Sequence, residues 1–101
     1  MKQVTRKIGL NKGKRRIWLE GAVLTDNGIN HGMRFNVVNQ DNALVISIDP
    51  DGKRKIAGRV DRPVIDMSAA TITDSFADDI KTVTVNPHHN QLALVLTGIK
   101  G

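Results

Sequence analysis

The sequence contains no cysteine, which excludes disulfide bonds, thiolate metal ligands and thiol nucleophiles together. Aromatic residues are scarce, with one Trp, two Phe and no Tyr, so a sheet that stacks several bases on aromatic side chains is not expected. No apolar run approaches the roughly 20 residues of a membrane-spanning helix, and the N-terminal residues lack the apolar stretch of a signal peptide. We therefore expect a soluble, cytoplasmic protein without a membrane partner.

Acidic residues are missing from the first 16 positions, which hold seven basic residues in a chain of net charge +5. A second basic cluster covers 53–62 and is interrupted only by Asp61. Clustering of this kind is typical of proteins that bind polyanions. The alternative is a basic surface that only increases solubility. The residues we expect to bind nucleic acid are Arg6, Lys7, Lys12, Lys14, Arg15, Arg16, Lys53, Arg54, Lys55, Arg59 and Arg62.

The chain resembles itself after a shift of 48 residues, which aligns 5–48 with 53–96. The shift superimposes Arg6-Lys7-Ile8 on Arg54-Lys55-Ile56 and Thr25-Asp26 on Thr73-Asp74. With 101 residues, of which 40% are hydrophobic and 25% charged, the chain has room for one core only. We therefore expect a single domain, 1–101, that contains two copies of one unit.

Each copy is expected to contain two strands, a short helix and two further strands. Apolar alternation and turn residues place strands at 4–10, 16–19, 34–40 and 43–48 around a helix at 20–27. In the second copy the strands are 53–58, 63–66, 81–86 and 91–97, and the helix is 68–76. Tight turns are expected at 11–14, 41–42 and 86–90, and Ser68 as a helix N-cap. The fold class is mainly β, with half the chain or more in strands and roughly a fifth in helices: a small pseudo-twofold barrel of two ββαββ repeats, as monomer or homodimer.

The stretch from Leu19 to Gly32, followed by Phe35-Asn36-Val37 and Leu44-Val45-Ile46, carries a recognisable pattern. In this stretch, the chain resembles the AbrB-like and SymE-like group of swapped-hairpin barrels. The positions that match the pattern of that group are Gly21, Leu24, Gly28, Ile29, Gly32 and Val37. The second copy keeps the hydrophobic positions but has Ala69, Ser75, Phe76 and Asp79 where the glycines would stand. The AbrB-like resemblance implies DNA binding by paired basic loops, here 12–16 and 59–62. The SymE-like resemblance implies a toxin that acts on RNA.

Residues for catalysis or metal binding are few. The adjacent His88 and His89 point to opposite faces if they lie on a strand, and a turn is the simpler interpretation. Asp49 and Asp51 flank a proline, as expected for a turn rather than a Mg²⁺ site, and Asp78-Asp79 is read as a solvated loop. No Gly-rich loop for a nucleotide phosphate is present. We expect no catalytic residue, no metal and no cofactor.

Trp18 has two interpretations. It lies beside Arg15 and Arg16, so it can stack on a base of a single strand, or it can pack in the core or against a helix, which we favour.

Three functions are compatible with these features. We favour a small basic nucleic-acid-binding protein, a bacterial or phage DNA-binding transcriptional regulator that prefers duplex DNA to RNA. The second is an inhibitor of a host defence complex, encoded by a phage or mobile element, whose partner is a protein. The third, and the only enzymatic one, is a SymE-like ribonuclease for which His31, His88 and His89 are the candidate acid–base groups.

Overall fold

The computed structural model describes residues 3–88 and 92–100, and 54% of these residues lie in strands and 9% in helices. The mainly β class is therefore confirmed. The elements are β1 (Val4–Lys7), β2 (Gly9–Asn11), β3 (Lys14–Glu20), α1 (Ala22–Thr25), β4 (Arg34–Gln40), β5 (Ala43–Ile48), β6 (Arg54–Lys55), β7 (Ala57–Arg59), β8 (Arg62–Met67), α2 (Ala69–Thr73), β9 (Thr82–Pro87) and β10 (Ala93–Ile99).

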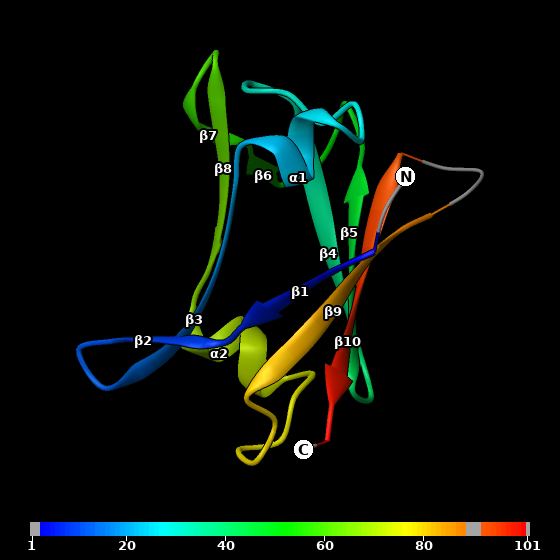
Figure 1. The fold of residues 1–101 in the computed structure, drawn as a ribbon. Helices are drawn as coiled ribbons and strands as arrows, with labels where there is room; N and C mark the ends of the chain where they lie inside the picture. The colour runs from blue at the N-terminus through cyan, green and yellow to red at the C-terminus, as the bar shows by residue number, and fades with distance from the viewer. Residues whose placement is uncertain (1–2, 89–91, 101) are drawn as a thin grey trace.

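The strands form two antiparallel sheets (Figure 1). The larger sheet has the order β1-β9-β10-β5-β4-β6, and the smaller one has the order β2-β3-β8-β7. The two helices lie near opposite ends of β3 and β8, and both contact β3. The radius of gyration of 12.7 Å is that of a compact domain of this size. Among the described residues, neither helix has the length and apolar character needed to cross a membrane.

The predicted strands at 4–10 and 53–58 are each wrong as a single element, because each is broken at an isoleucine. Ile8 separates β1 from β2 and donates its N–H to the carbonyl of Lys81 at 2.8 Å, and Ile56 separates β6 from β7 and donates to Met33 at 2.8 Å. Ile56 is buried and Ile8 packs against the core. The chain passes from one sheet to the other at each break, so each half-strand pairs in a different sheet.

Both helices are much shorter than predicted. Glu20 still pairs with Val64 in the sheet, and Gly21, at φ 71°, ends the strand in a backbone conformation that glycine adopts without strain. Thr25 and Thr73 are the last helical residues, and Asp26 and Asp74 are the C-caps, so the repeated Thr-Asp pair marks helix ends rather than helix interiors. Ser68 is the N-cap residue of α2, but its side chain makes no capping hydrogen bond.

The positions of the tight turns agree more closely with those predicted from the sequence. The β2–β3 hairpin turns on Lys12 and Gly13, both in the left-handed region, so β2 extends to Asn11 and β3 begins at Lys14, inside the predicted turn. Asp41 and Asn42 join β4 to β5 as predicted. In the last hairpin, residues 86 and 87 belong to β9 and β10 begins at Ala93, while residues 89–91 of the predicted turn and strand lie outside the described part.

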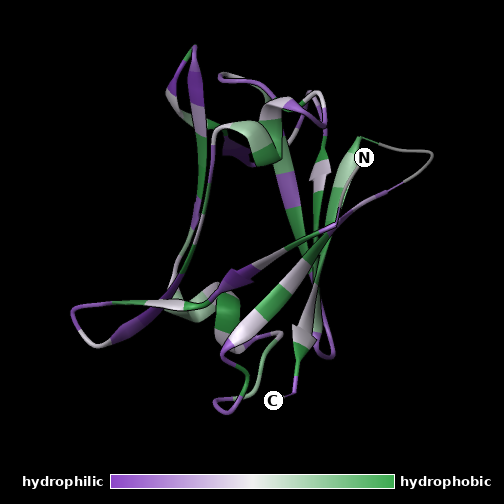
Figure 2. Cartoon of the chain, in the orientation of Figure 1, coloured by the Kyte–Doolittle hydropathy of each residue, from purple (hydrophilic) through white to green (hydrophobic). Residues whose placement is uncertain are grey.

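Buried apolar residues alternate with exposed residues along the strands, and the buried ones form the core between the two sheets. Ile17 and Leu19 on β3 are fully buried, whereas Trp18 between them is 44% exposed. The core interpretation of Trp18 is therefore wrong. Phe35 on β4 and Leu44 on β5 are also buried. Figure 2 shows hydrophobic residues concentrated on the strands of the larger sheet and on the helices, with mostly hydrophilic residues at the tips of the β2–β3 and β7–β8 hairpins.

Candidate nucleic-acid interface

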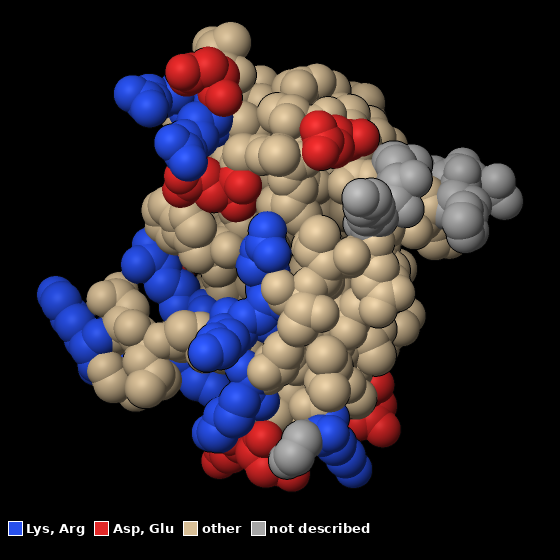
Figure 3. All heavy atoms as spheres, in the orientation of Figure 1, with Lys and Arg blue, Asp and Glu red and all other residues tan. Residues whose placement is uncertain are grey.

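The first basic cluster lies on β1 and on the β2–β3 hairpin. Arg6 and Lys7 are exposed on β1, and Lys12 and Lys14 are exposed at the hairpin tip. We call these four residues the basic face. Figure 3 shows Lys and Arg side chains gathered over β1 and this hairpin on one side of the molecule. No carboxylate of residues 3–88 or 92–100 forms an ion pair with any of the four.

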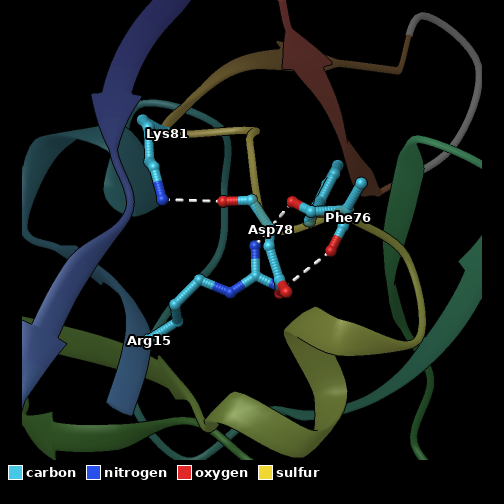
Figure 4. A network of polar contacts seen from close by, with 5 residues as sticks. Arg15, Phe76, Asp78 and Lys81 are labelled. Atoms are coloured by element: carbon cyan, nitrogen blue, oxygen red, sulfur yellow. Dashed lines mark hydrogen bonds and ion pairs between the residues drawn. The ribbon is translucent and has the colours of Figure 1, made fainter. Parts of the chain in front are cut away.

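Arg15 belongs to the same stretch but has a structural role. Its side chain is only 12% exposed, and its two terminal nitrogens donate to the carbonyls of Phe76 and Ala77 at 2.7 and 2.9 Å. An ion pair to Asp78 at 3.6 Å and the hydrogen bond from Lys81 Nζ to the carbonyl of Asp78 complete the network (Figure 4). Arg15 therefore holds the α2–β9 loop against β3, and its donors face the chain's own carbonyls rather than solvent.

Arg16 points to the opposite side of β3, where it forms a network with Trp18. Its Nε and Nη2 donate to the two carboxylate oxygens of Asp66 on β8 at 2.8 and 3.0 Å. The guanidinium carbon lies 4.4 Å from the centre of the Trp18 ring, within range of a cation–π contact. The indole Nε1 donates to Glu20 Oε2 at 2.7 Å, and Glu20 also pairs with Arg62 at 2.5 Å. Two arginines and two carboxylates thus surround the indole with balanced charge.

The hydrogen bond to Asp66 raises the pKa of Arg16 above its ordinary value, and the charge of the carboxylate adds to this effect. A base whose pKa is raised by folding keeps its contribution to stability at every pH below the ordinary value. Because that value is already strongly alkaline, Arg16 stays charged throughout the neutral range. The cation over Trp18 is therefore permanent.

The second basic cluster is not assembled with the first. Lys53, Arg54 and Lys55 lie in or beside β6, at the edge of the larger sheet opposite β1. Arg54 donates to the hydroxyl of Thr71 in α2 at 3.0 Å. At the β7–β8 tip, Arg59 pairs with Asp61 at 3.8 Å and Arg62 with Glu20, and Figure 3 shows basic and acidic side chains mixed there. The two predicted basic loops therefore differ. Lys12 and Lys14 in the loop at 12–16 have no carboxylate partner among the described residues, whereas Arg59 and Arg62 in the loop at 59–62 are both in ion pairs.

A hollow of about 470 Å³ opens beside the basic face. It lies between the β2–β3 hairpin, the end of β8 and the first residues of α2. Its charged lining consists of Lys12, Lys14, Arg15, Arg16 and Asp66. Arg16 is paired with Asp66 and Arg15 with carbonyls of the chain, so Lys12 and Lys14 are the lining cations that remain to attract an anionic group.

The candidate catalytic and metal residues remain scattered. His31 is exposed in the loop after α1, His88 is exposed after β9, and His89 lies outside the described residues. Asp49 accepts the backbone N–H of Asp51 at 2.9 Å, which is the local bond of a turn. Within the described ranges, no group of three or more His, Asp or Glu side chains could hold a metal ion.

Sequence reasoning missed the roles of Glu20 and Asp66 as partners of Arg16 and Trp18. The spacing Arg16-x-Trp18-x-Glu20 carried a usable signal, because residues two apart on a strand share one face. The contribution of Asp66 depends on strand pairing, which no local pattern shows.

Comparison with models of protein families, with curated proteins and with solved structures finds no match to this chain. The resemblance to the AbrB-like and SymE-like barrels therefore rests on the sequence pattern alone.

Proposed function

We propose that this protein binds nucleic acid through the basic face of Arg6, Lys7, Lys12 and Lys14. The observation that carries the proposal is the lack of a carboxylate partner for any of these four among the described residues, on a chain of net charge +5. Cations without acidic partners are free to replace the counterions of a phosphate backbone. A bacterial or phage regulator of transcription is the form of this function that the sequence favours.

The shape of the β2–β3 hairpin supports the proposal. It is a two-stranded ribbon whose tip carries Lys12 and Lys14, and a ribbon of two strands is narrow enough to enter the major groove of duplex DNA. The hairpin can equally follow the backbone of a single strand, because its lysines contact phosphates rather than base edges.

We further propose that the fold is a duplicated, pseudo-twofold barrel. In support, the order of each sheet is unchanged when every strand is exchanged for its counterpart in the other repeat, for example β2 for β7 and β5 for β10. Ile46 pairs with Leu94, and Trp18 with Asp66, and in each pair the repeat aligns the two residues with each other. The correspondence fails in the β9–β10 hairpin. Phe35 on β4 pairs with Ile48 on β5, and the residues aligned with these two are Val83 and Leu96. Val83 instead pairs with Gly98. One chain then supplies both halves, so a monomer suffices.

The test is a salt titration of binding, measured by fluorescence anisotropy with labelled duplex DNA, duplex RNA and single strands. Four phosphate contacts predict a slope of about −3.6 in log K against log salt on duplex DNA, and a loss of affinity of about 100-fold between 50 and 200 mM salt. Binding that is weaker than micromolar at 50 mM salt to every polymer would contradict the proposal.

A protein partner is the second candidate, and exposed apolar side chains favour it. Leu10 on β2 is 73% exposed and Val60 at the β7–β8 turn is 84% exposed. Each is a single exposed side chain and not part of one patch, but each lies on a hairpin where a partner protein can contact it. An inhibitor of a host defence complex would use them together with the basic face. A shallow salt slope with every nucleic acid would favour this candidate.

A further inference from the structure

We propose that Trp18 stacks an unpaired nucleobase on the outer face of β3 while Lys12 and Lys14 hold the phosphates of the same strand. The ligand class of this site is then single-stranded nucleic acid. This inference rests on the proposed function and deepens it, because phosphate contacts alone do not distinguish paired from unpaired strands.

The exposure of Trp18 is the first observation. It is the only tryptophan of the chain, and it lies in the centre of the smaller sheet, paired with Asp66, with 44% of its surface in solvent. Its neighbours Ile17 and Leu19 are fully buried, so the alternation of β3 points the indole away from the core. An indole that folding leaves in solvent is available for a contact made by a ligand.

The second observation is that the indole is already fixed in place. Arg16 covers one face of the ring at 4.4 Å and is itself held by the two hydrogen bonds to Asp66. Glu20 accepts the indole N–H at 2.7 Å. With 44% of Trp18 in solvent, a base can stack on the exposed part of the ring that Arg16 leaves uncovered. Because both side chains are ordered before binding, little conformational entropy is lost when a base arrives.

The third observation is the position of the phosphate-binding groups. Lys14, Arg16 and Trp18 occupy alternate positions on one face of β3, so successive members are about 7 Å apart. Arg16 both covers Trp18 and lines the hollow that Lys12 and Lys14 border. Beyond the indole along β3, Glu20 forms an ion pair with Arg62. Lys12 and Lys14, which have no carboxylate partner among the described residues, lie on the hairpin side of Trp18 and therefore direct the backbone of the strand toward the hairpin.

Paired bases cannot use this site. In a duplex both faces of each base are covered by its neighbours, whereas the bases of single strands are free to stack on aromatic side chains. The single Trp18 accommodates one base, and no second aromatic side chain is exposed on the described part of the smaller sheet. We therefore expect little preference among base sequences and a clear dependence on the presence of a base.

The test uses the whole protein and three labelled ligands: a thymidine oligonucleotide, an abasic strand of the same length, and a duplex of that length. Anisotropy reports binding, and the fluorescence of Trp18 reports stacking because no other tryptophan contributes. We expect the thymidine strand to bind about 5- to 150-fold more tightly than the abasic strand and to quench Trp18. Trp18→Ala should remove this difference, Trp18→Phe should keep part of it, and Val38→Ala, an exposed apolar residue of β4, should leave it unchanged.

Equal affinity for the thymidine and abasic strands, or binding without quenching, would overturn the stacking site and leave the basic face intact. Absence of binding to all three ligands at low salt would overturn the proposed function as well. Thermal unfolding by circular dichroism checks that each variant is folded. If Trp18→Ala does not fold, the quenching of the wild-type protein and the comparison with Trp18→Phe decide the matter.

Discussion

Arg15 and Arg16 are neighbours in the sequence, but the alternation of β3 sends their side chains to opposite faces. Arg15 turns inward and binds the carbonyls of Phe76 and Ala77, and Arg16 turns outward to Asp66 and Trp18. From the sequence, both arginines were placed in the first basic cluster and were expected to bind nucleic acid. Their separation follows from the two-residue period of a strand, so charge clustering along a sequence does not establish charge clustering in space.

This division predicts opposite effects for two arginine variants. Arg15→Ala should lower the free energy of unfolding by about 1–3 kcal/mol, because two carbonyls lose their charged donor, and it should leave the salt slope of binding nearly unchanged. Arg6→Ala removes an exposed charge of β1, and it should change stability by less than about 0.5 kcal/mol while making the slope shallower by about 0.9. Urea unfolding and anisotropy measure the two quantities. A shallower slope for Arg15→Ala at unchanged stability would contradict the structural role of Arg15.

At the scale of elements, the β2–β3 and β7–β8 hairpins differ in chemistry although they occupy the two opposite edges of the smaller sheet. The first carries Lys12 and Lys14 without acidic partners among the residues described, and the second carries Arg59 and Arg62 in ion pairs with Asp61 and Glu20. An ion-paired arginine must give up its carboxylate before it can contact phosphate. The first hairpin is therefore the stronger candidate for binding.

Removing two charges from each hairpin tests this difference. The Lys12→Ala and Lys14→Ala double variant should bind duplex DNA with a slope shallower by about 1.8, which corresponds to two lost phosphate contacts. The matched Arg59→Ala and Arg62→Ala double variant lowers the net charge equally and should change the slope by less than half of that. Both hairpin tips are exposed, so neither pair should change the midpoint of thermal unfolding by more than a few degrees. Equal changes in slope would contradict the one-sided interface.

Much of the fold was predictable from the sequence because strand alternation and turn residues are local signals. Ile17 and Ile65 illustrate what the pattern contains: both are buried, and they pair with Met67 and Leu19 across the contact between β3 and β8. The breaks at Ile8 and Ile56 were not predictable, because an apolar residue within a strand is compatible both with continuation and with a change of sheet. The first helix was predicted to begin too early because Glu20 still belongs to β3 and Gly21 ends that strand.

The site was predictable in its charge but not in its arrangement. The basic residues of 6–16 were identified from the sequence. The hydrogen bonds of Arg15 to the α2–β9 loop and the ion pair of Arg62 with Glu20 were not, because these contacts join residues distant in sequence. Trp18 was assigned to the core or to a contact with a helix, because the large apolar indole is usually mostly buried. Only the register of β3 against β8 places it on the outer face beside Asp66.

At the scale of the whole molecule, the two proposed repeats occupy corresponding places in the sheets but differ in their distribution of charge. The two sheet orders are symmetric under exchange of the proposed repeats, yet Arg6, Lys7, Lys12 and Lys14 lie together at β1 and the β2–β3 hairpin, whereas Lys53 and Lys55, which also lack carboxylate partners among the described residues, lie apart from them at β6. Trp18 has no equivalent, since the repeat aligns it with Asp66. A chain with the same charges in both repeats would bind two equal half-sites. Because the charges of this chain differ between the repeats, we expect it to bind one segment of single-stranded nucleic acid on one side.

Chemical-shift mapping of the backbone amides on titration with a single-stranded oligonucleotide tests this one-sided interface most directly. The account predicts that the largest changes fall on β1, the β2–β3 hairpin and the indole N–H of Trp18, and that the β7–β8 hairpin and β6 change little. Changes of similar size on both hairpins would contradict it and restore the symmetric pair of basic loops.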